Sequence, residues 1–466
     1  MSIPLSRRHV LAGLASAGLV PIARGDRPPN VLWISIDDLN DWTGVLGGHP
    51  QASTPHIDAL AARGRAFTQA HCNAPACNPS RTATLTGVAP HRSGVYNNQS
   101  AWWVPLGEVP TLPALLRAHG YRTLGAGKVF HFGDRGVWDA YMGDPCDKLH
   151  TDEGGRPRKS DLVRVDDMAW GRSRSKKDKG HPDRRIADWV SAQLALPQAQ
   201  PFFLAAGFMK PHLPWYAPRP FFDERPIDAV VLPHVPPDEM ADIPAEGQRL
   251  AYMKTHHKVV KTEEWQSAVR GYLAATSFVD SMLGEVIAAL DASAHKENTL
   301  VVLWSDHGWS LGEKFHWKKF ALWEECTRVP LVFAGPGITP GPCDHVVGLI
   351  DLYPTLARIC GATVPHIIDG IDLGPLLADP SLRWHRPVLT TQGESNHAIR
   401  TQRWRYIRYG DGGEELYDHS QDPGEHKNLV GTPGAELVLD QLRPLIPKTT
   451  APIAPTTISK CRPGPL

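Results

Sequence analysis

Two clusters of metal-ligand side chains stand out because each lies just after a short apolar run. Asp37-Asp38 follows residues 31–36, and Asp306-His307 comes just after residues 300–304. Adjacent carboxylates repel each other unless a cation or a base lies between them, and carboxylate oxygens suit hard divalent metals. An imidazole can complete such a site or take part in acid–base chemistry. Taken alone, each cluster could also be an ordinary polar turn.

A third cluster contains a thiol. Cys77-Asn78-Pro79-Ser80-Arg81 is followed by Leu85-Thr86-Gly87. The guanidinium of Arg81 would favour an anion near Cys77. The residues themselves leave three interpretations open: a reactive cysteine, the first turn of a helix, or a chance grouping.

The elements that must position these clusters are short apolar strands. Residues 31–36, 202–206, 300–304 and 329–333 are rich in β-branched or aromatic side chains and end near Gly, Pro or Asp. Helical patterns lie between or beside them at 54–63, 112–119, 266–289 and 351–360. Continuous apolar strands alternating with helices predict an α/β fold with a mainly parallel sheet covered on both faces. Ligands bind beyond the carboxyl ends of the strands in such sheets.

Composition divides the chain into parts. A Pro- and Leu-rich stretch at 375–386 separates an expected catalytic domain, residues 26–374, from a C-terminal subdomain, residues 375–466. The latter contains a strand-like segment at 403–409, followed by the turn Asp411-Gly412-Gly413. The polar, basic stretch 154–185 is predicted to be a surface insertion. The charges of residues 172–185 could steer a polyanionic saccharide, or this part could be an ordinary solvated loop.

The first 23 residues are typical of an export signal. Ser6-Arg7-Arg8 precedes an apolar stretch, residues 10–20, that is too short to span a bilayer. The arginine pair favours a twin-arginine signal over a Sec signal. No other run is predicted to span a membrane, so we expect a periplasmic or extracellular mature protein. Lys+Arg and Asp+Glu both number 49, and this balance gives no indication of a nucleic-acid partner.

The thiol cluster matches the C-x-P-S-R signature of the formylglycine-dependent sulfatases, and Asp37-Asp38 and residues 305–308 fall where that family has metal ligands. Residues 127–131 (GKVFH), 210–214 (KPHLP) and 305–313, with Trp317 and Lys319 after them, resemble the iduronate-2-sulfatase branch. The resemblance covers residues 30 to about 429 and departs from the extended signature at Val88. It implies an alkaline-phosphatase-like sulfatase fold, a large sheet sandwiched by helices with a smaller C-terminal α+β domain.

The resemblance also implies a mechanism. A separate maturation enzyme would convert Cys77 to formylglycine, whose hydrate has one hydroxyl to attack sulfur and a second to expel sulfate. The implied Ca²⁺ ligands are Asp37, Asp38, Asp306, His307 and the modified Cys77. Many relatives have Asn where this chain has His307. Loss of one thiol would leave six of the seven cysteines, which could pair or stay free.

The remaining implied catalytic residues carry charge or protons. Arg81 and Lys128 would stabilise the hydrate and the metal shell, and His131 would assist proton removal. His212 and Lys319 would hold the sulfate and protonate the leaving alcohol.

A sulfated carbohydrate is the implied substrate, and a 2-O-sulfated uronic acid is the specific hypothesis. Four polar or aromatic side chains could line a sugar subsite: Trp102, Trp103, Gln392 and His397. The tryptophan pair could equally pack in the core. Three alternatives stay open: a phosphodiester or phosphonate monoester hydrolase of the same superfamily, a non-catalytic protein that binds sulfated glycans, and a hydrolase that uses the unmodified thiolate of Cys77.

Overall fold

A computed structural model of the chain describes residues 28–147, 156–174 and 180–463. Its centre is an eight-stranded sheet in the order β13-β2-β12-β9-β1-β7-β3-β4. The strands are β1 (Asn30–Ile36), β2 (Arg65–His71), β3 (Arg122–Gly127), β4 (Ala140–Tyr141), β7 (Phe202–Phe208), β9 (Thr299–Ser305), β12 (Arg328–Ala334) and β13 (Gly341–Gly348). All neighbours pair in parallel except β12, which runs antiparallel to both β2 and β9. The predicted mainly parallel sheet is confirmed.

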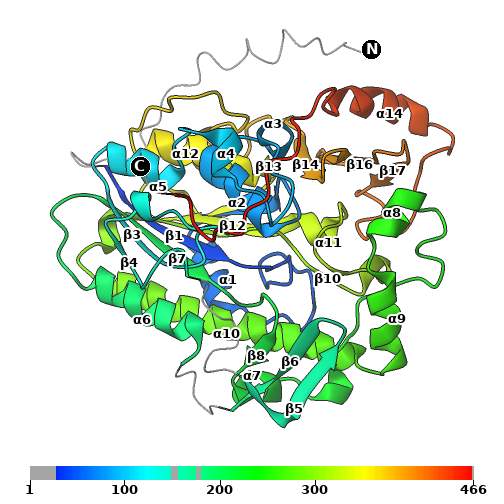
Figure 1. Cartoon of the computed structure of the whole chain (residues 1–466), viewed down its shortest axis with the longest axis horizontal. Helices are drawn as coiled ribbons and strands as arrows, with labels where there is room; N and C mark the ends of the chain where they lie inside the picture. Colours follow the sequence, from blue (N-terminus) through cyan, green and yellow to red (C-terminus); the bar gives the residue numbers. More distant parts are fainter. Residues whose placement is uncertain (1–27, 148–155, 175–179, 464–466) are drawn as a thin grey trace.

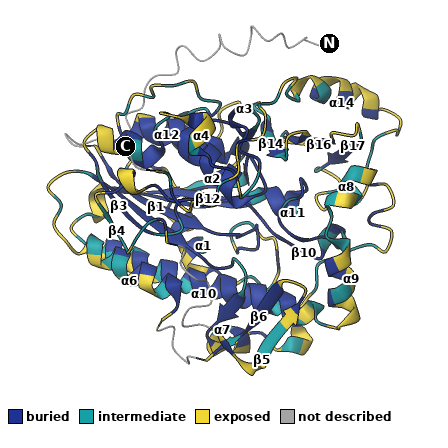
Figure 2. Ribbon diagram, viewed as in Figure 1, coloured by how far each residue is buried: buried dark blue, intermediate teal, exposed yellow. Residues whose placement is uncertain are grey.

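Helices cover both faces of this sheet (Figure 1). One face packs against α1 (Pro55–Ala62), α6 (Pro182–Leu194) and α10 (Trp265–Asp291). The other packs against α2 (Cys77–Thr86), α5 (Leu112–Ala118) and α12 (Leu352–Ile359). Figure 2 shows the strands buried between these two layers. This double burial explains why the strands read as continuous apolar runs.

Helix α10 is the only helix of the described residues that is long and apolar enough to cross a membrane. Most of it is buried inside the protein, where it packs on α1, α6 and β8 (Trp215–Ala217). Core helices of soluble proteins pass the same test, so this helix is weak evidence for a membrane span.

The stretch 154–185 is not a surface insertion throughout. It contains β5 (Pro157–Val165) and β6 (Met168–Ser173), which form a small sheet with β8, and the first turn of α6. Met168 and Trp170 are buried in a core cluster beside α10. Lys176, Lys177 and Lys179 lie outside the described residues, as does the predicted export signal.

The C-terminal domain is built on the antiparallel sheet β14 (Val388–Gln392), β15 (Asn396–Arg400), β16 (Trp404–Arg408) and β17 (Glu414–Asp418), followed by α14 (Ala435–Leu442). An ionic cluster joins it to the large domain. Arg405, which is fully buried, pairs with Glu324 and Glu425. The other helices are short: α3 (Pro90–Ser93), α4 (Trp103–Leu106), α7 (Arg219–Asp223), α8 (Ala245–Leu250), α9 (Met253–Lys261), α11 (Glu324–Thr327) and α13 (Gly374–Ala378).

Residues 451–463, which we call the C-terminal strap, return to the large domain. The strap exchanges main-chain hydrogen bonds with residues 91–101 and with Gly133. Cys146 and Cys461 form a disulfide, and the other five cysteines are buried and free. Of the six thiols that could have paired once Cys77 is set aside, two do so.

Candidate active site

The site lies beyond the carboxyl ends of four adjacent parallel strands. β9, β1, β7 and β3 are neighbours in the sheet, with Ile36 level with Ser305 and with Phe208. Asp37 and Asp306 are the next residues after β1 and β9, and Lys128 is the next residue after β3. Parallel strands therefore bring residues that are up to 269 positions apart in sequence to one edge of the sheet.

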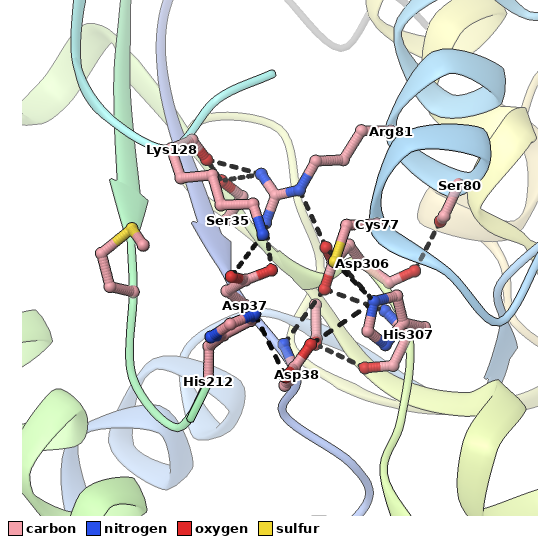
Figure 3. A network of polar contacts seen from close by, with 12 residues as sticks. Ser35, Asp37, Asp38, Cys77, Ser80, Arg81, Lys128, His212, Asp306 and His307 are labelled. Atoms are coloured by element: carbon pink, nitrogen blue, oxygen red, sulfur yellow. Dashed lines mark hydrogen bonds and ion pairs between the residues drawn. The ribbon is translucent and has the colours of Figure 1, made fainter. Parts of the chain in front are cut away.

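Cys77 is the first residue of α2 and only 1% exposed. Figure 3 shows its sulfur pointing toward His307 and Asp38. The Sγ atom lies 3.0 Å from Lys319 Nζ and 3.3 Å from His307 Nε2. Burial would raise the pKa of the thiol, but the ammonium groups of Lys128 and Lys319 outweigh it and hold that pKa well below its usual range. An anion at this position is therefore stabilised.

Arg81 lies between the two acidic clusters. Its Nε donates to Asp306 Oδ2 at 2.8 Å, and its Nη2 lies 3.2 Å from Asp37 Oδ1. The other Asp37 oxygen pairs with Lys128 Nζ at 2.5 Å. Burial would raise the pKa of Asp37, but Lys128, His212 and Arg81 lower it well below the usual range. Asp37 is thus held as a carboxylate.

Asp38 is held in a left-handed conformation with φ of 64°. Its Oδ1 lies 2.7 Å from Lys319 Nζ and 3.5 Å from His307 Nε2. Its Oδ2 is buried and has no hydrogen-bond partner. Strained non-glycine backbone persists only where surrounding contacts fix it, and it is common at functional sites. The geometry therefore aims a carboxylate at the centre of the cluster.

The four side chains Asp37, Asp38, Cys77 and His307 suit a divalent cation, because each places a ligand atom within 4.8 Å of the others. His307 Nδ1 hydrogen-bonds Gly308 O at 3.0 Å, which leaves Nε2 facing the cluster. Burial would lower the pKa of His307, but Asp306 and Cys77 raise it to about 9. The surroundings of Nε2 thus favour positive charge there, whether a proton or a cation. Asp306 is not in this group: its Oδ2 accepts from Arg81 Nε at 2.8 Å and lies 3.6 Å from His307 Nε2, so its role as a ligand stays a prediction.

A second group of acids and imidazole, Glu324, His419 and Glu425, could also hold a metal by spacing. The guanidinium of Arg405 already pairs with both carboxylates, and His419 bonds Glu425 at 2.9 Å. We therefore interpret this group as a buried ionic cluster rather than a metal centre.

His212 lies on the partly open side of the site, with 32% of its side chain exposed. It follows β7 in a loop with cis peptide bonds before Pro211 and Pro214. Its Nδ1 hydrogen-bonds Leu213 O at 2.6 Å, and its Nε2 lies 3.9 Å from Asp38 Oδ2. Burial lowers the pKa of His212. Nε2 is therefore the atom that can exchange a proton with a bound molecule.

His131 lies in the connection after β3, half-buried, with its ring edge-on to Phe132 at 4.9 Å. It is not part of the four-residue ligand cluster. Its proposed role in proton removal stays a prediction.

The predicted sugar-binding residues separate into two pairs. Trp102 is 2% exposed, stacks on Phe130 and donates its indole N–H to Phe132 O at 3.1 Å. His397 is 3% exposed and bonded to the Thr391 hydroxyl at 3.1 Å. Neither exposes appreciable surface in this structure, and Trp102 packs in an apolar cluster with Phe132, so contact of these two residues with a sugar stays a prediction.

The other pair keeps accessible surface. Trp103 is half-buried at the start of α4, and Gln392 ends β14, where it accepts a hydrogen bond from Asn396 at 3.0 Å. Contact of these two residues with the substrate stays a prediction.

Sequence reasoning missed two supporting residues. Asp183, in the first turn of α6, accepts the main-chain N–H groups of Met209 and Lys210 at 2.6 and 2.9 Å and so fixes the start of the His212 loop. His316 contacts the main chain of Lys319. Both bond main-chain atoms in or beside the motifs at 210–214 and 317–319, and main-chain partners leave no pattern of side-chain types in the sequence.

Comparison with known proteins agrees with this geometry. The family model described as Sulfatase matches residues 29–362, and that described as N-sulphoglucosamine sulphohydrolase, C-terminal, matches residues 312–451. A protein named Sulfatase from Formosa agariphila is 35% identical over 91% of this chain and 87% of its own length. A Delta 4,5-hexuronate-2-O-sulfatase from Bacteroides thetaiotaomicron is 30% identical over 93% of this chain and 91% of its own. A solved 2-O GAG sulfatase superimposes with a TM-score of 0.71 and 26% identity, covering 90% of this chain and 91% of that one.

The mixed sheet, its two helical layers and the cation-suited edge define a hydrolase of the alkaline-phosphatase-like class. Within that class the chain belongs to the sulfatase family, and it is a sulfuric ester hydrolase.

Proposed function

We propose that the protein removes a 2-O-sulfate from a uronic acid residue of a sulfated glycan, with formylglycine made from Cys77 and with bound Ca²⁺. The observation that carries the proposal is the setting of Cys77. This buried thiol begins α2, and its Sγ lies among Lys319, His307 and the carboxylates of Asp37 and Asp38. A relative named a hexuronate 2-O-sulfatase and a similar solved 2-O GAG sulfatase support the choice of sugar and sulfate position.

Asp37, Asp38 and His307 would hold the cation together with the group made from Cys77, since the ligand atoms of these four residues lie within 4.8 Å of one another, and Asp306 would complete the shell from beside His307. When present, Ca²⁺ would neutralise sulfate oxygens, and formylglycine would supply a hydroxyl nucleophile. The chain itself orients these groups. Arg81 fixes Asp37 and Asp306 relative to each other, and Lys128 adds a second positive charge at Asp37. Such preorganised charges stabilise a transition state without reorganising during the reaction.

Lys319 and His212 would act at the leaving oxygen. Burial would lower the pKa of Lys319, but Asp38 and Cys77 raise it, so the side chain stays an ammonium at working pH. It is suited to neutralise charge on the departing oxygen. His212 titrates more readily, because burial lowers its pKa and its Nε2 faces the site. We assign proton delivery to His212 and charge stabilisation to Lys319.

Mass spectrometry of the peptide that spans residues 66–81, made with a maturation enzyme co-expressed, tests the nucleophile. We expect an aldehyde in place of the Cys77 thiol and loss of turnover in Cys77→Ala. Cys343→Ala is the matched control, because Cys343 is an equally buried free cysteine on β13. An unmodified thiol in fully active protein would refute the proposal.

Substrate choice is tested with defined disaccharides. We expect faster release of sulfate from a 2-O-sulfated unsaturated uronate than from a 6-O-sulfated glucosamine. Comparison of an aryl sulfate with an aryl phosphate diester addresses the phosphodiesterase alternative. Faster turnover of the phosphate diester would overturn the assignment of substrate class.

We further propose that residues 1–23 direct export by the twin-arginine route. Replacement of Arg7 and Arg8 by lysine should retain the protein in the cytoplasm, as measured by cell fractionation. Unchanged export of that variant would favour the Sec alternative.

A further inference from the structure

We propose that His316 is a positioning residue that sets the place of the Lys319 ammonium in the active site. The inference rests on the role of Lys319 under the proposed function. His316 does not reach the reacting atoms, and it acts through the main chain of the residue that does.

Lys319 lies in an irregular segment just after β11. The short strands β10 (Ser310–Leu311) and β11 (Trp317–Lys318) pair antiparallel, and the chain leaves β11 toward α11. The residues on either side of Lys319 are both left-handed, Lys318 with φ of 80° and Phe320 with φ of 81°. Non-glycine residues adopt this region only when surrounding contacts fix it. The place of the Lys319 side chain therefore depends on what holds this segment.

His316 supplies one of those contacts through a fixed tautomer. Its Nδ1 lies 3.0 Å from the main-chain N of Tyr252, and its Nε2 lies 3.0 Å from Lys319 O. A main-chain N–H can only donate and a carbonyl can only accept, so Nδ1 must accept and Nε2 must carry the proton. The ring is fully buried, and burial lowers its pKa to about 3. His316 is thus neutral throughout the working pH range and keeps both bonds.

The peptide unit that follows Lys319 is held from both sides. Its carbonyl accepts from His316, and its N–H, that of Phe320, donates to Pro75 O at 3.0 Å. Pro75 lies two residues before Cys77, so this second bond ties the segment to the start of α2. From this fixed main chain the Lys319 ammonium reaches Asp38 at 2.7 Å and Cys77 at 3.0 Å.

Two substitutions separate the two bonds of His316. In His316→Gln, the terminal amide nitrogen falls near the position of Nε2 and can still donate to Lys319 O. In His316→Asn, the amide can accept from Tyr252 N–H but is too short to reach Lys319. Displacement of a catalytic group by about 1 Å can lower the rate on the order of 100-fold. We expect His316→Asn to lower kcat about 10- to 100-fold with little change in KM, and His316→Gln to stay within about threefold of the unsubstituted enzyme.

Leaving-group dependence distinguishes positioning from a general loss of structure. Aryl sulfates whose phenol leaving groups have a higher pKa need more charge stabilisation at the departing oxygen. The loss of kcat in His316→Asn should therefore grow along a series of such substrates, and the loss in Lys319→Ala should grow in the same way. His256→Asn is the matched control. His256 lies in α9 and is buried. It accepts a hydrogen bond at 3.2 Å from the indole of Trp317, which is in the same hairpin as His316, and this bond does not involve the Lys319 carbonyl. It should lose thermal stability without a change in leaving-group dependence.

All rates are taken per folded, modified enzyme. Equal losses in the Gln and Asn variants, or a loss independent of the leaving group, would overturn the role of His316. If His316→Asn does not fold, His316→Gln alone tests the proposal. The role of His316 would then be overturned if the kcat of His316→Gln depended on the leaving group as steeply as the kcat of Lys319→Ala. Full activity of Lys319→Ala would instead refute the proposed role of Lys319, and the inference for His316 would fall with it.

Discussion

Arg405→Met is expected to destabilise the protein strongly, because Arg405 joins the two domains through buried ion pairs. Its guanidinium is fully buried, pairs with Glu324 and Glu425, and donates to Leu322 O and Thr327 Oγ1, both at 3.0 Å. Methionine fills much of the same volume without charge. The variant would leave two buried carboxylates facing each other with less positive charge around them.

Removing one partner of a buried ion pair costs about 3–5 kcal/mol. Arg400 lies 3.3 Å from Glu324, and His419 lies 2.9 Å from Glu425, so part of the compensation remains. We therefore expect about 3 kcal/mol, near the lower end of that range. Arg403→Met is the control. Arg403 pairs with Asp418 at 2.6 Å, but 57% of its side chain is exposed, so its loss should cost at most about 1 kcal/mol.

The sign of the pH dependence gives a second check. Burial would raise the pKa of Glu324, but Arg400 and Arg405 lower it well below the usual range, and Arg405 also lowers that of Glu425. In the unsubstituted protein this stabilisation is present above the unfolded glutamate pKa of about 4.3 and is lost as the pH falls. In Arg405→Met burial dominates and the carboxyls protonate at higher pH. The stability difference between the two proteins should therefore shrink from pH 7 to pH 5.

Urea unfolding followed by circular dichroism at both pH values measures these quantities. A cost below 1 kcal/mol, equal to that of Arg403→Met, would refute the reasoning. A difference that grows as the pH falls would refute it too. The double variant Arg405→Met, Glu425→Gln should recover part of the loss, since it removes one uncompensated charge.

Three further outcomes are expected. Chelation of divalent cations should abolish turnover and lower the Tm, and Ca²⁺ at about 100 times its Kd should restore about 2.7 kcal/mol. Asp183→Ala should lower kcat about tenfold, because it releases the main chain before His212. Asp280→Ala is the control and should not lower kcat. The Asp280 carboxylate also accepts two main-chain N–H groups, at 2.8 and 3.1 Å, but it lies away from the site. Cys461→Ser should cost about 2–5 kcal/mol in urea titrations by loss of the bond to Cys146. An unaltered Tm after chelation, an unaltered kcat in Asp183→Ala or an unaltered urea midpoint in Cys461→Ser would contradict the corresponding expectation.

The parts of the fold that were predictable are those buried on both faces. Strands such as β1 and β9 are buried at every position and apolar at most of them, so their ends are visible in the sequence as abrupt polar clusters. Once those strands are known to be parallel neighbours, the proximity of Asp37 and Asp306 follows from the topology. The direction of β12 could not be predicted, since an apolar run looks the same whether it runs parallel or antiparallel.

Other features depended on tertiary contacts that leave no local pattern. Beyond its first turn, α6 buries only four residues, which lie along one side: Ile186, Ala187, Val190 and Leu194. The helical spacing of these residues was not recognised, because they directly follow a polar and basic stretch. The burial of Trp102 likewise depends on Phe130 and Phe132, which arrive from the segment after β3. Two adjacent tryptophans fit a sugar subsite and a core equally well until that packing is known.

The disulfide has a consequence for the order of events in the cell. Cys146 and Cys461 are separated by 315 residues, so their bond can close only after nearly the whole large domain and the C-terminal sheet have been synthesised. If residues 1–23 are a twin-arginine signal, the chain crosses the membrane already folded, and it does so from a reducing compartment. The strap would then reach the oxidising side already bound to Gly133 by main-chain hydrogen bonds, which would keep Cys461 in the large domain until the bond to Cys146 forms. Oxidation would seal a finished structure after transport instead of guiding its folding.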